Sequence, residues 1–209
     1  MITTKGLTFN YPEGGGSFSF PDIALGEENH LLILGPSGIG KTTLLHLLSG
    51  ILPPLKGKIY INNTDICSLD RKALDLFRGQ NIGIIFQHYH YIKSLSVEEN
   101  LMLRQRFPQR LIDKERRLSL LNRLGLKKAL TKKGPQLSQG QKQRLAIALG
   151  LIHQPKLVLA DEPTSNLDDQ NCDAVISLLK EEAKLCGSHL VIITHDQRVK
   201  RHFNHQIVL

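Results

Sequence analysis

The sequence has no tryptophan, few aromatic residues (5%) and only three cysteines among 209 residues. Cys67, Cys172 and Cys186 are odd in number and lack zinc-type spacing, so they argue against a disulfide scaffold or a zinc site and are typical of a reducing compartment. No apolar run approaches the roughly 20 residues that span a bilayer. The first fifteen residues also lack the apolar segment of a signal peptide. We therefore expect inert thiols and no membrane-spanning helix.

Acidic residues are outnumbered, with 19 Asp and Glu against 27 Lys and Arg, which gives a net charge of +8. A basic balance favours anionic partners such as nucleic acid, anionic lipid or phosphorylated ligands, but an ordinary solvated basic face has the same composition. Hydrophobic residues make up 41% of the chain and charged residues 22%, which is typical of globular proteins. The length suits one large domain that buries its own core.

Short apolar strands alternate with helical segments along most of the chain. The first thirty residues are broken by proline and glycine, which predicts antiparallel hairpins. Later segments predict strands at 30–34, 57–63, 81–87, 156–162 and 189–196, and helices at 41–51, 97–107, 113–126, 141–153 and 171–186. The alternation predicts an α/β fold with a mostly parallel sheet that helices cover on both faces. Residues 88–138 are polar and leucine-periodic and read as a helical insertion.

A phosphate-binding loop is predicted at GPSGIGKT (35–42), which lies between an apolar strand and a helix. Its glycines permit a tight turn whose backbone N–H groups point inward, and the following helix N-terminus favours an anion. Lys41 is expected to reach the β- and γ-phosphates, Thr42 to ligate Mg²⁺, and Thr43 to contact the α-phosphate. An ordinary glycine turn is the alternative, and the Lys-Thr ending and the flanking elements argue against it.

Two carboxylates end the strand at KLVLADE (156–162). Asp161 should face the phosphate loop, because open α/β sheets bind ligands at the carboxyl ends of their strands, and it would hold Mg²⁺. Glu162 is the candidate to polarise the attacking water. Without the phosphate loop, the pair could be a solvated strand end.

LSQGQ (137–141) separates this chain from other phosphate-loop proteins. It resembles the LSGGQ signature of the nucleotide-binding subunits of ABC transporters. The order also resembles that family: phosphate loop, FQ (86–87), signature, DE (161–162), SNLD (165–168) and TH (194–195). The resemblance covers essentially the whole chain.

The resemblance implies the ABC ATPase fold: one domain over 1–209 with a phosphate-loop core and an antiparallel β part (1–87 and 139–209), and a helical subdomain (88–138). It implies ATP hydrolysis to ADP and phosphate, with ATP and Mg²⁺ as ligands. The expected ATP contacts are Tyr11, Gly35, Pro36, Ser37, Gly38, Ile39, Gly40, Lys41, Thr42 and Thr43.

Further roles follow from the resemblance alone. Tyr11 would stack under adenine, with Phe9 the weaker candidate and a core position the alternative for Tyr11. Gln87 would touch Mg²⁺ or the attacking water, and His195 would hold the γ-phosphate and the water. The expected catalytic residues are Lys41, Gln87, Glu162 and His195, and the expected metal residues are Thr42, Gln87 and Asp161.

The resemblance also implies a head-to-tail homodimer. The signature residues Ser138, Gln139, Gly140 and Gln141 would contact the ATP of the other subunit. Asp168 would link the two sites across the interface. The sequence departs from the family at Gln139, which stands where the signature has its first glycine. We expect activity to survive if that side chain points away from the nucleotide.

Within the family, NIGIIFQ, SLSVEENLML and ADEPTSNLD resemble the branch that serves lipoprotein-release, macrolide-export and cell-division permeases. The chain ends soon after His195, so we expect a separate subunit. It would be peripheral on the cytoplasmic side of the inner membrane and bound to an integral membrane permease, with no nucleic acid partner. Gln87 and a set of arginines would form the docking surface, although a solvated helix face is the alternative for each arginine: Arg104, Arg106, Arg110, Arg116 and Arg117.

Three other functions compete with this interpretation. A soluble ABC-type ATPase acting on nucleic acid or ribosomes would fit the +8 charge. A small-molecule phosphotransferase would have no use for LSQGQ or Gln87. A catalytically inactive binding module does not fit the presence of Lys41, Asp161, Glu162 and His195.

Overall fold

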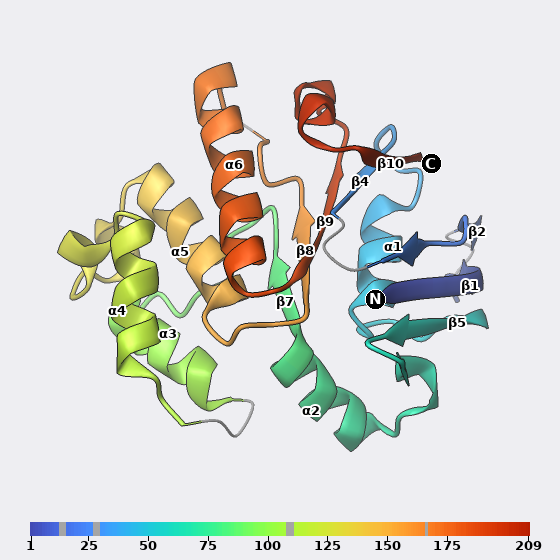
Figure 1. Cartoon of the computed structure of the whole chain (residues 1–209), viewed down its shortest axis with the longest axis horizontal. Helices are drawn as coiled ribbons and strands as arrows, with labels where there is room; N and C mark the ends of the chain where they lie inside the picture. Colours follow the sequence, from blue (N-terminus) through green and yellow to red (C-terminus); the bar gives the residue numbers. More distant parts are fainter. Residues whose placement is uncertain (13–15, 27–29, 108–110, 166) are drawn as a thin grey trace.

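A parallel sheet of five strands forms the centre of the molecule (Figure 1). The computed structural model describes residues 1–12, 16–26, 30–107, 111–165 and 167–209. The strand order is β10 (His205–Val208), β4 (Leu31–Leu34), β9 (His189–Thr194), β8 (Leu157–Asp161) and β7 (Ile82–Ile85), and each neighbouring pair is parallel. The expected α/β class is confirmed.

Alternate positions of the central strands pack into two different hydrophobic layers. Leu32, Val158 and Ile192 belong to one layer, and Ile33 and Leu159 belong to the other. A strand places successive side chains on opposite faces, so continuous apolar runs such as LLIL are needed where both faces are covered.

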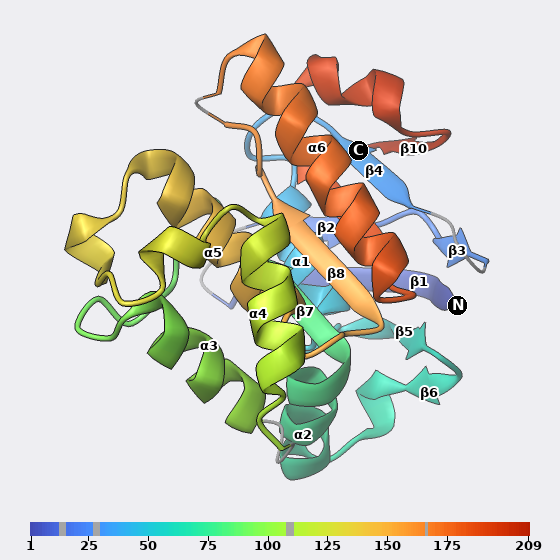
Figure 2. The ribbon, with the colours of Figure 1, turned by 60° about the vertical axis from the view of Figure 1, so that its left-hand side comes forward.

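Helices cover both faces of this sheet (Figures 1 and 2). On one face lie α5 (Gln139–Leu151) and α6 (Asp169–Leu185), which contribute Leu145 and Leu179 to the first layer. On the other lies α1 (Lys41–Leu48), whose four leucines belong to the second layer.

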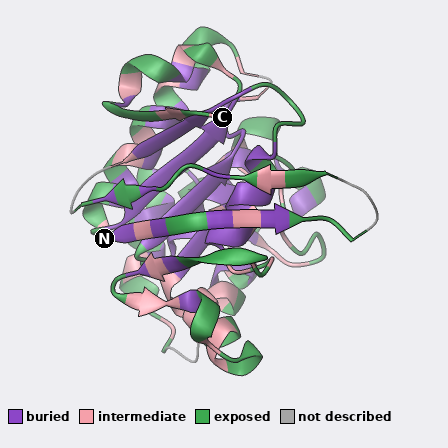
Figure 3. Cartoon of the chain, turned by 90° about the vertical axis from the view of Figure 1, so that its right-hand side faces the viewer, coloured by how far each residue is buried: buried purple, intermediate pink, exposed green. Residues whose placement is uncertain are grey.

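An antiparallel sheet lies beyond α1 at the opposite end of the molecule from α3 and α4 (Figure 1), and Figure 3 views the molecule from the side of this sheet. Its central strand β1 (Ile2–Asn10) pairs with three antiparallel partners: β2 (Ser17–Ser19), β3 (Ala24–Leu25) and β5 (Lys56–Ile61). A short strand β6 (Thr64–Asp65) pairs antiparallel with β5 at the edge of this sheet. The predicted hairpins of the first thirty residues are confirmed.

The polar stretch after β7 contains two helices, α3 (Val97–Arg106) and α4 (Lys114–Arg123), followed by the 3₁₀ turns η2 (Lys127–Ala129) and η3 (Gly134–Gln136). Ser96 caps α3 in a capping box with Glu99, and Asp113 caps α4. Both helices were expected. The division into a core (1–87 and 139–209) and a helical subdomain (88–138) stays a prediction.

Helix α2 (Arg71–Asn81) and strand β10 were not predicted. Helix α2 precedes β7, after the 3₁₀ turn η1 (Ile66–Ser68), and begins at the Asp70 cap. Strand β10 follows the 3₁₀ turn η4 (Gln197–His202) and pairs with β4. No helix in the described part of the chain is both long and apolar enough to cross a membrane.

Arg104 does not belong to an exposed docking surface. Its guanidinium donates to the carbonyls of Gly79 (3.2 Å) and Ile82 (3.3 Å) and lies 2.9 Å from His153 Nε2. Burial lowers the pKa of Arg104 to about 10, because desolvation disfavours the charged form. This residue anchors α3 to the junction of α2 and β7.

Two further arginines of that set are also engaged inside the molecule. Arg117 is 4% exposed and pairs with Glu98 at 2.9 Å. Arg116 donates to the Leu151 carbonyl (3.4 Å) and to Cys186 Sγ (3.1 Å). These internal contacts argue against the expected docking role for Arg104, Arg116 and Arg117. Arg106 is exposed, and Arg110 lies outside the described residues.

Candidate nucleotide site

The carboxyl ends of four neighbouring strands bring the predicted site residues to one edge of the sheet. Strand β4 leads into Gly35, β8 ends at Asp161 and Glu162, β9 leads to His195, and β7 precedes Gln87. Because these strands are parallel and adjacent in the order β4-β9-β8-β7, segments far apart in sequence meet here, such as Thr42 and Asp161, which are 119 residues apart.

The phosphate loop has the tight backbone that its glycines predict. Gly38 and Gly40 have φ angles of +85° and +101°, which L side chains rarely adopt. A Cβ on Gly40 would also lie 2.6 Å from the Phe18 ring, so the antiparallel sheet packs against the loop. Residues 36–39 are exposed at the start of α1, where backbone N–H groups are available to an anion.

Lys41 lies folded across its own loop. Its Nζ donates to the carbonyls of Gly35 (2.8 Å) and Pro36 (2.9 Å) and lies 3.9 Å from Glu162 Oε1. The side chain is only 7% exposed, so its charge is aimed into the site. A phosphate chain in the loop would meet this ammonium directly.

Thr42 and Asp161 face each other, with Thr42 Oγ1 donating to Asp161 Oδ2 at 3.1 Å. Burial, with a further contribution from the Glu162 charge, raises the pKa of Asp161 despite the Thr42 hydrogen bond. A buried carboxylate beside a hydroxyl is an oxygen donor set that suits Mg²⁺. These two residues therefore fit the expected metal.

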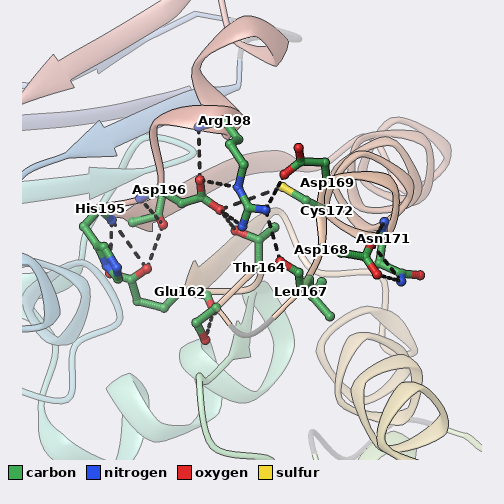
Figure 4. A network of polar contacts seen from close by, with 12 residues as sticks. Glu162, Thr164, Leu167, Asp168, Asp169, Asn171, Cys172, His195, Asp196 and Arg198 are labelled. Carbon is green, nitrogen blue, oxygen red and sulfur yellow. Dashed lines mark hydrogen bonds and ion pairs between the residues drawn. The ribbon is translucent and has the colours of Figure 1, made fainter.

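Glu162 is held by the strand next to its own. Its backbone has a φ of +49°, an unusual conformation for a non-glycine residue. Thr194 Oγ1 donates to Glu162 Oε2 (2.7 Å), and the His195 backbone N–H donates to Oε1 (3.1 Å). His195 Nδ1 lies 2.7 Å from the same Oε1. The carboxylate and the imidazole thus form one unit (Figure 4).

Tyr11 lies beside the phosphate loop. Its hydroxyl is 2.9 Å from Thr43 Oγ1, and its ring is 38% exposed. Phe9 packs edge-on against Tyr11 at 4.8 Å and is itself only 8% exposed, so Tyr11 is the better stacking surface of the two. Phe18, which the sequence did not single out, contacts both the Tyr11 ring at 6.0 Å and the loop at Gly40.

Gln87 and Glu162 line a common cavity of about 350 Å³, together with Gln139 and Gln143. Gln143 Nε2 donates to the Pro163 carbonyl at 2.8 Å, which ties α5 to the segment that follows β8. The cavity thus joins the predicted catalytic carboxylate to the loop that begins at Gln87. A position for Gln143 was not predicted, because a glutamine within a helix carries no local signal.

The LSQGQ segment opens α5. Ser138 is the N-cap, and it forms a capping box with Gln141 in which each side chain accepts the other's backbone N–H. A Cβ on Gly140 would meet nothing within 4 Å, so this face of the helix terminus is open. Gln139 Nε2 lies 3.4 Å from the Tyr89 hydroxyl of the same chain, so the side chain is directed toward that loop.

Asp168 caps α6, since its Oδ1 accepts from the Asn171 backbone N–H (2.9 Å). The bonds from Asn171 hold the pKa of Asp168 below its ordinary value, and the residue is exposed. A structural role thus accounts for this aspartate within one chain. The structure assembles the phosphate loop with Asp161, Glu162, His195 and Tyr11, whereas the LSQGQ segment contacts the loop after Gln87.

The phosphate loop with Lys41, and the carboxylates of Asp161 and Glu162 beside it, fit the class of phosphate-loop nucleotide hydrolases. Comparison with known proteins narrows this class. The profile described as ABC transporter matches residues 21–165. The chain therefore belongs to the ABC transporter family, as an ATP-binding and ATP-hydrolysing cassette.

Two curated relatives from Legionella pneumophila carry the name lipoprotein-releasing system ATP-binding protein LolD. That from strain Lens is 36% identical and that from strain Paris 38% identical, over 214 aligned positions that cover 100% of this chain and 94% of each relative.

Solved structures agree in fold. The bacterial ABC transporter cassette MJ0796, solved as a dimer, has a TM-score of 0.88 and 33% identity and covers 100% of this chain and 94% of its own. The structure of the same cassette bound to ADP and Pi, in a post-hydrolysis state, has a TM-score of 0.88 and 32% identity. The cbiO1 protein of Clostridium perfringens is described as part of the ABC transporter complex cbiONQ. Its structure has a TM-score of 0.87 and 30% identity, and the match covers 99% of this chain and 83% of that chain.

Proposed function

We propose that two copies of this chain bind two ATP molecules between them, and that ATP-driven closure of this dimer powers a separate integral membrane permease. The proposed system is of the lipoprotein-releasing type, with the cassette peripheral on the cytoplasmic side of the inner membrane. Support for the type comes from relatives named LolD that match this chain over its whole length. Support for the dimer comes from the related cassette that is solved as one.

The observation that carries the catalytic proposal is the setting of Glu162. Its carboxylate lies at the strand end, 3.9 Å from Lys41 Nζ and bonded to Thr194 and His195. A base held by three donors keeps its orientation when water arrives, and an oriented base activates water better than a mobile one.

Residue roles follow from the same geometry. Lys41 and the loop N–H groups would bind the phosphate chain, Tyr11 would stack on adenine, and His195 would hold the γ-phosphate. Mg²⁺, when bound by Thr42, Asp161 and Gln87, would neutralise phosphate charge. Within the second copy, the exposed N-terminus of α5 at Ser138 and Gly140 would supply N–H donors to the same γ-phosphate.

The catalytic proposal is tested with Glu162→Gln. The amide keeps the size of the side chain and can keep contacts to Thr194, but it cannot take a proton from water. We expect ATP hydrolysis to fall by about 10² or more, while ATP binding persists and a dimer accumulates. Size-exclusion chromatography with and without ATP, beside a steady-state ATPase assay, measures both. Wild-type turnover by this variant would sink the proposal.

The partner is tested by recovering tagged Glu162→Gln protein from detergent-solubilised membranes with and without ATP. A stoichiometric integral membrane protein is the expected result, identified by mass spectrometry. Wild-type protein and a Lys41→Ala variant, in which we expect weaker nucleotide binding, serve as controls. Recovery of ribosomal proteins or nucleic acid without a membrane protein would contradict the permease.

A further inference from the structure

A continuous series of hydrogen bonds leads away from Glu162 toward the α6 terminus (Figure 4). Thr194 Oγ1 donates to Glu162 Oε2 at 2.7 Å and accepts from the Asp196 backbone N–H at 3.0 Å. Thr194 therefore links Asp196 to the Glu162–His195 unit. The catalytic proposal gives Asp196 no role, although its side chain is only 11% exposed.

Arg198 makes a bidentate contact with the Asp196 carboxylate. Its Nε donates to Asp196 Oδ1 (2.9 Å) and its Nη2 to Oδ2 (2.8 Å), and its backbone N–H also donates to Oδ1 (3.0 Å). Thr164 Oγ1 donates to Oδ2 at 2.9 Å. Bidentate arginine–carboxylate pairs fix geometry as well as charge. The turn after His195 is thereby clamped to the segment that follows Glu162.

The remaining guanidinium nitrogen of Arg198, Nη1, contacts residues at the start of α6. Arg198 Nη1 donates to the Leu167 carbonyl (3.1 Å) and to Asp169 Oδ1 (2.7 Å). Leu167 and Asp169 flank Asp168 on either side. One side chain therefore contacts both the turn that carries His195 and the two residues around Asp168, as Figure 4 shows.

We propose that Arg198 is a positioning residue of the ATPase site, which holds the segment around Asp168 in register with the turn that carries His195. The inference rests on the proposed function, in which His195 meets the γ-phosphate, and on the prediction from the family resemblance that Asp168 lies at the interface with the second cassette. Arg198 makes the two act as one unit. Nucleotide state sensed at His195 then reaches the dimer interface through five donated hydrogen bonds of a single arginine.

Simple attachment of η4 to α6 does not need this residue, because that contact has other anchors. Arg201 and His202 of η4 both pair with Asp173 on α6. Lys180 Nζ of α6 donates to the His202 carbonyl at 2.6 Å. Loss of Arg198 should thus release the Asp168 segment and leave η4 in place. Arg201 offers a matched control, since it joins the same two elements without touching Asp196 or Leu167.

The test compares Arg198→Met with Arg201→Met. We expect kcat of Arg198→Met to fall about tenfold or more with KM for ATP within about twofold, since misplacing a group affects the reacting geometry more than ground-state binding. Arg201→Met should keep both constants. Arg198→Lys keeps the charge but cannot make the fork, so we expect no full rescue.

A double-mutant cycle with Asp168→Asn identifies the route. Asparagine keeps the α6 cap but removes the charge at the interface. If Arg198 acts through this segment, adding Arg198→Met to Asp168→Asn lowers kcat by clearly less than it does alone. Independent, multiplying effects would overturn the proposal, and so would equal kcat for the Arg198 and Arg201 variants.

Two checks keep the result interpretable. If Arg198→Met does not fold, Asp169→Ala removes one of the contacts from an exposed residue (81% exposed side chain), and a smaller kcat decrease without a KM change is expected there. The proposed function fails separately: then wild type and Arg201→Met would hydrolyse no ATP, or Glu162→Gln would form no ATP-dependent dimer.

Discussion

At the scale of single residues, Gln139 shows how a departure from the family pattern is accommodated. Its side chain leans toward Tyr89 of the same chain, at 3.4 Å, and the adjacent Gly140 stays open. The glycine next to the substitution thus keeps the helix terminus accessible. That arrangement fits the expectation that activity tolerates Gln139.

The first prediction contrasts these two neighbours. Gln139→Ala removes one long, exposed hydrogen bond, worth at most about 1 kcal/mol, and should leave kcat within about twofold. Gly140→Ala adds a Cβ that touches nothing in the free chain, so the melting temperature should hold. It would obstruct the face offered to the other subunit's ATP, and kcat should drop at least about tenfold, or 1.4 kcal/mol.

Steady-state ATPase assays and thermal melts of both variants decide the matter. Equal activity of Gly140→Ala and wild type would argue that this helix face meets no nucleotide. A large loss in Gln139→Ala alone would instead make the contact with Tyr89 part of the site.

At the scale of elements, the strands β4, β8 and β9 and their following loops were predictable, because buried parallel strands are continuous apolar runs. Strand β10 was not, since HQIV is mostly exposed and only its pairing with β4 defines it. Helix α2 was missed because its polar sequence buries only Gly79 fully.

The site shows the same division. The phosphate loop and the acidic pair could be predicted because their residues are neighbours in sequence. The contact of Tyr11 with Thr43 and the role of Arg198 between Asp196 and Leu167 could not, because they join segments about 30 residues apart whose meeting depends on the whole fold. Local patterns specify elements, whereas these bonds depend on how elements are packed.

The second prediction concerns the close approach of β7 and α5. A Cβ on Gly83 would lie 2.0 Å from the Gly150 carbonyl oxygen, which is backbone and cannot turn aside. Gly83→Ala should therefore cost about 1–3 kcal/mol of unfolding free energy. Gly150→Ala meets Cγ1 of the buried Ile85 side chain at 2.8 Å, a longer distance to a side-chain atom, and alanine favours the helix by about 1 kcal/mol, so its cost should be smaller.

Urea denaturation of the two variants measures this difference directly. We expect Gly83→Ala to have the lowest free energy of unfolding. Gly150→Ala should be more stable than Gly83→Ala, and at most as stable as wild type. The reverse order would mean that α5 shifts freely against β7, and that Gly83 sets no limit on their separation.

At the scale of the whole molecule, several of the positive charges form ion pairs with carboxylates of the same chain. Arginines on three elements, α2, α4 and η4, form ion pairs with acidic partners: Arg78, Arg116, Arg117, Arg123, Arg198 and Arg201. The net charge of +8 therefore does not by itself define a nucleic-acid surface. The same pairs make stability depend on acid.

The last prediction is that stability falls as pH drops from about 4 toward 2. Contacts with Arg201 and Arg198 lower the pKa of Asp173 and of Asp196 to about 2, from an ordinary value of 3.8. A carboxyl group whose folded pKa is depressed stabilises the fold fully above its unfolded pKa, and loses that contribution as pH falls through the folded pKa. Above pH 5 these two groups should give no pH dependence.

Urea denaturation at pH 6, 4 and 2.5 checks this, with Asp173→Asn, Asp196→Asn and the double variant as comparisons. An asparagine cannot titrate, so each variant should be less stable than wild type at pH 6 and lose less on acidification. Because Asp196 is the less exposed of the two, its variant should show the larger effect. If the double variant kept the full acid dependence of wild type, other carboxylates would carry it, and the arginine pairs would not be what acid breaks.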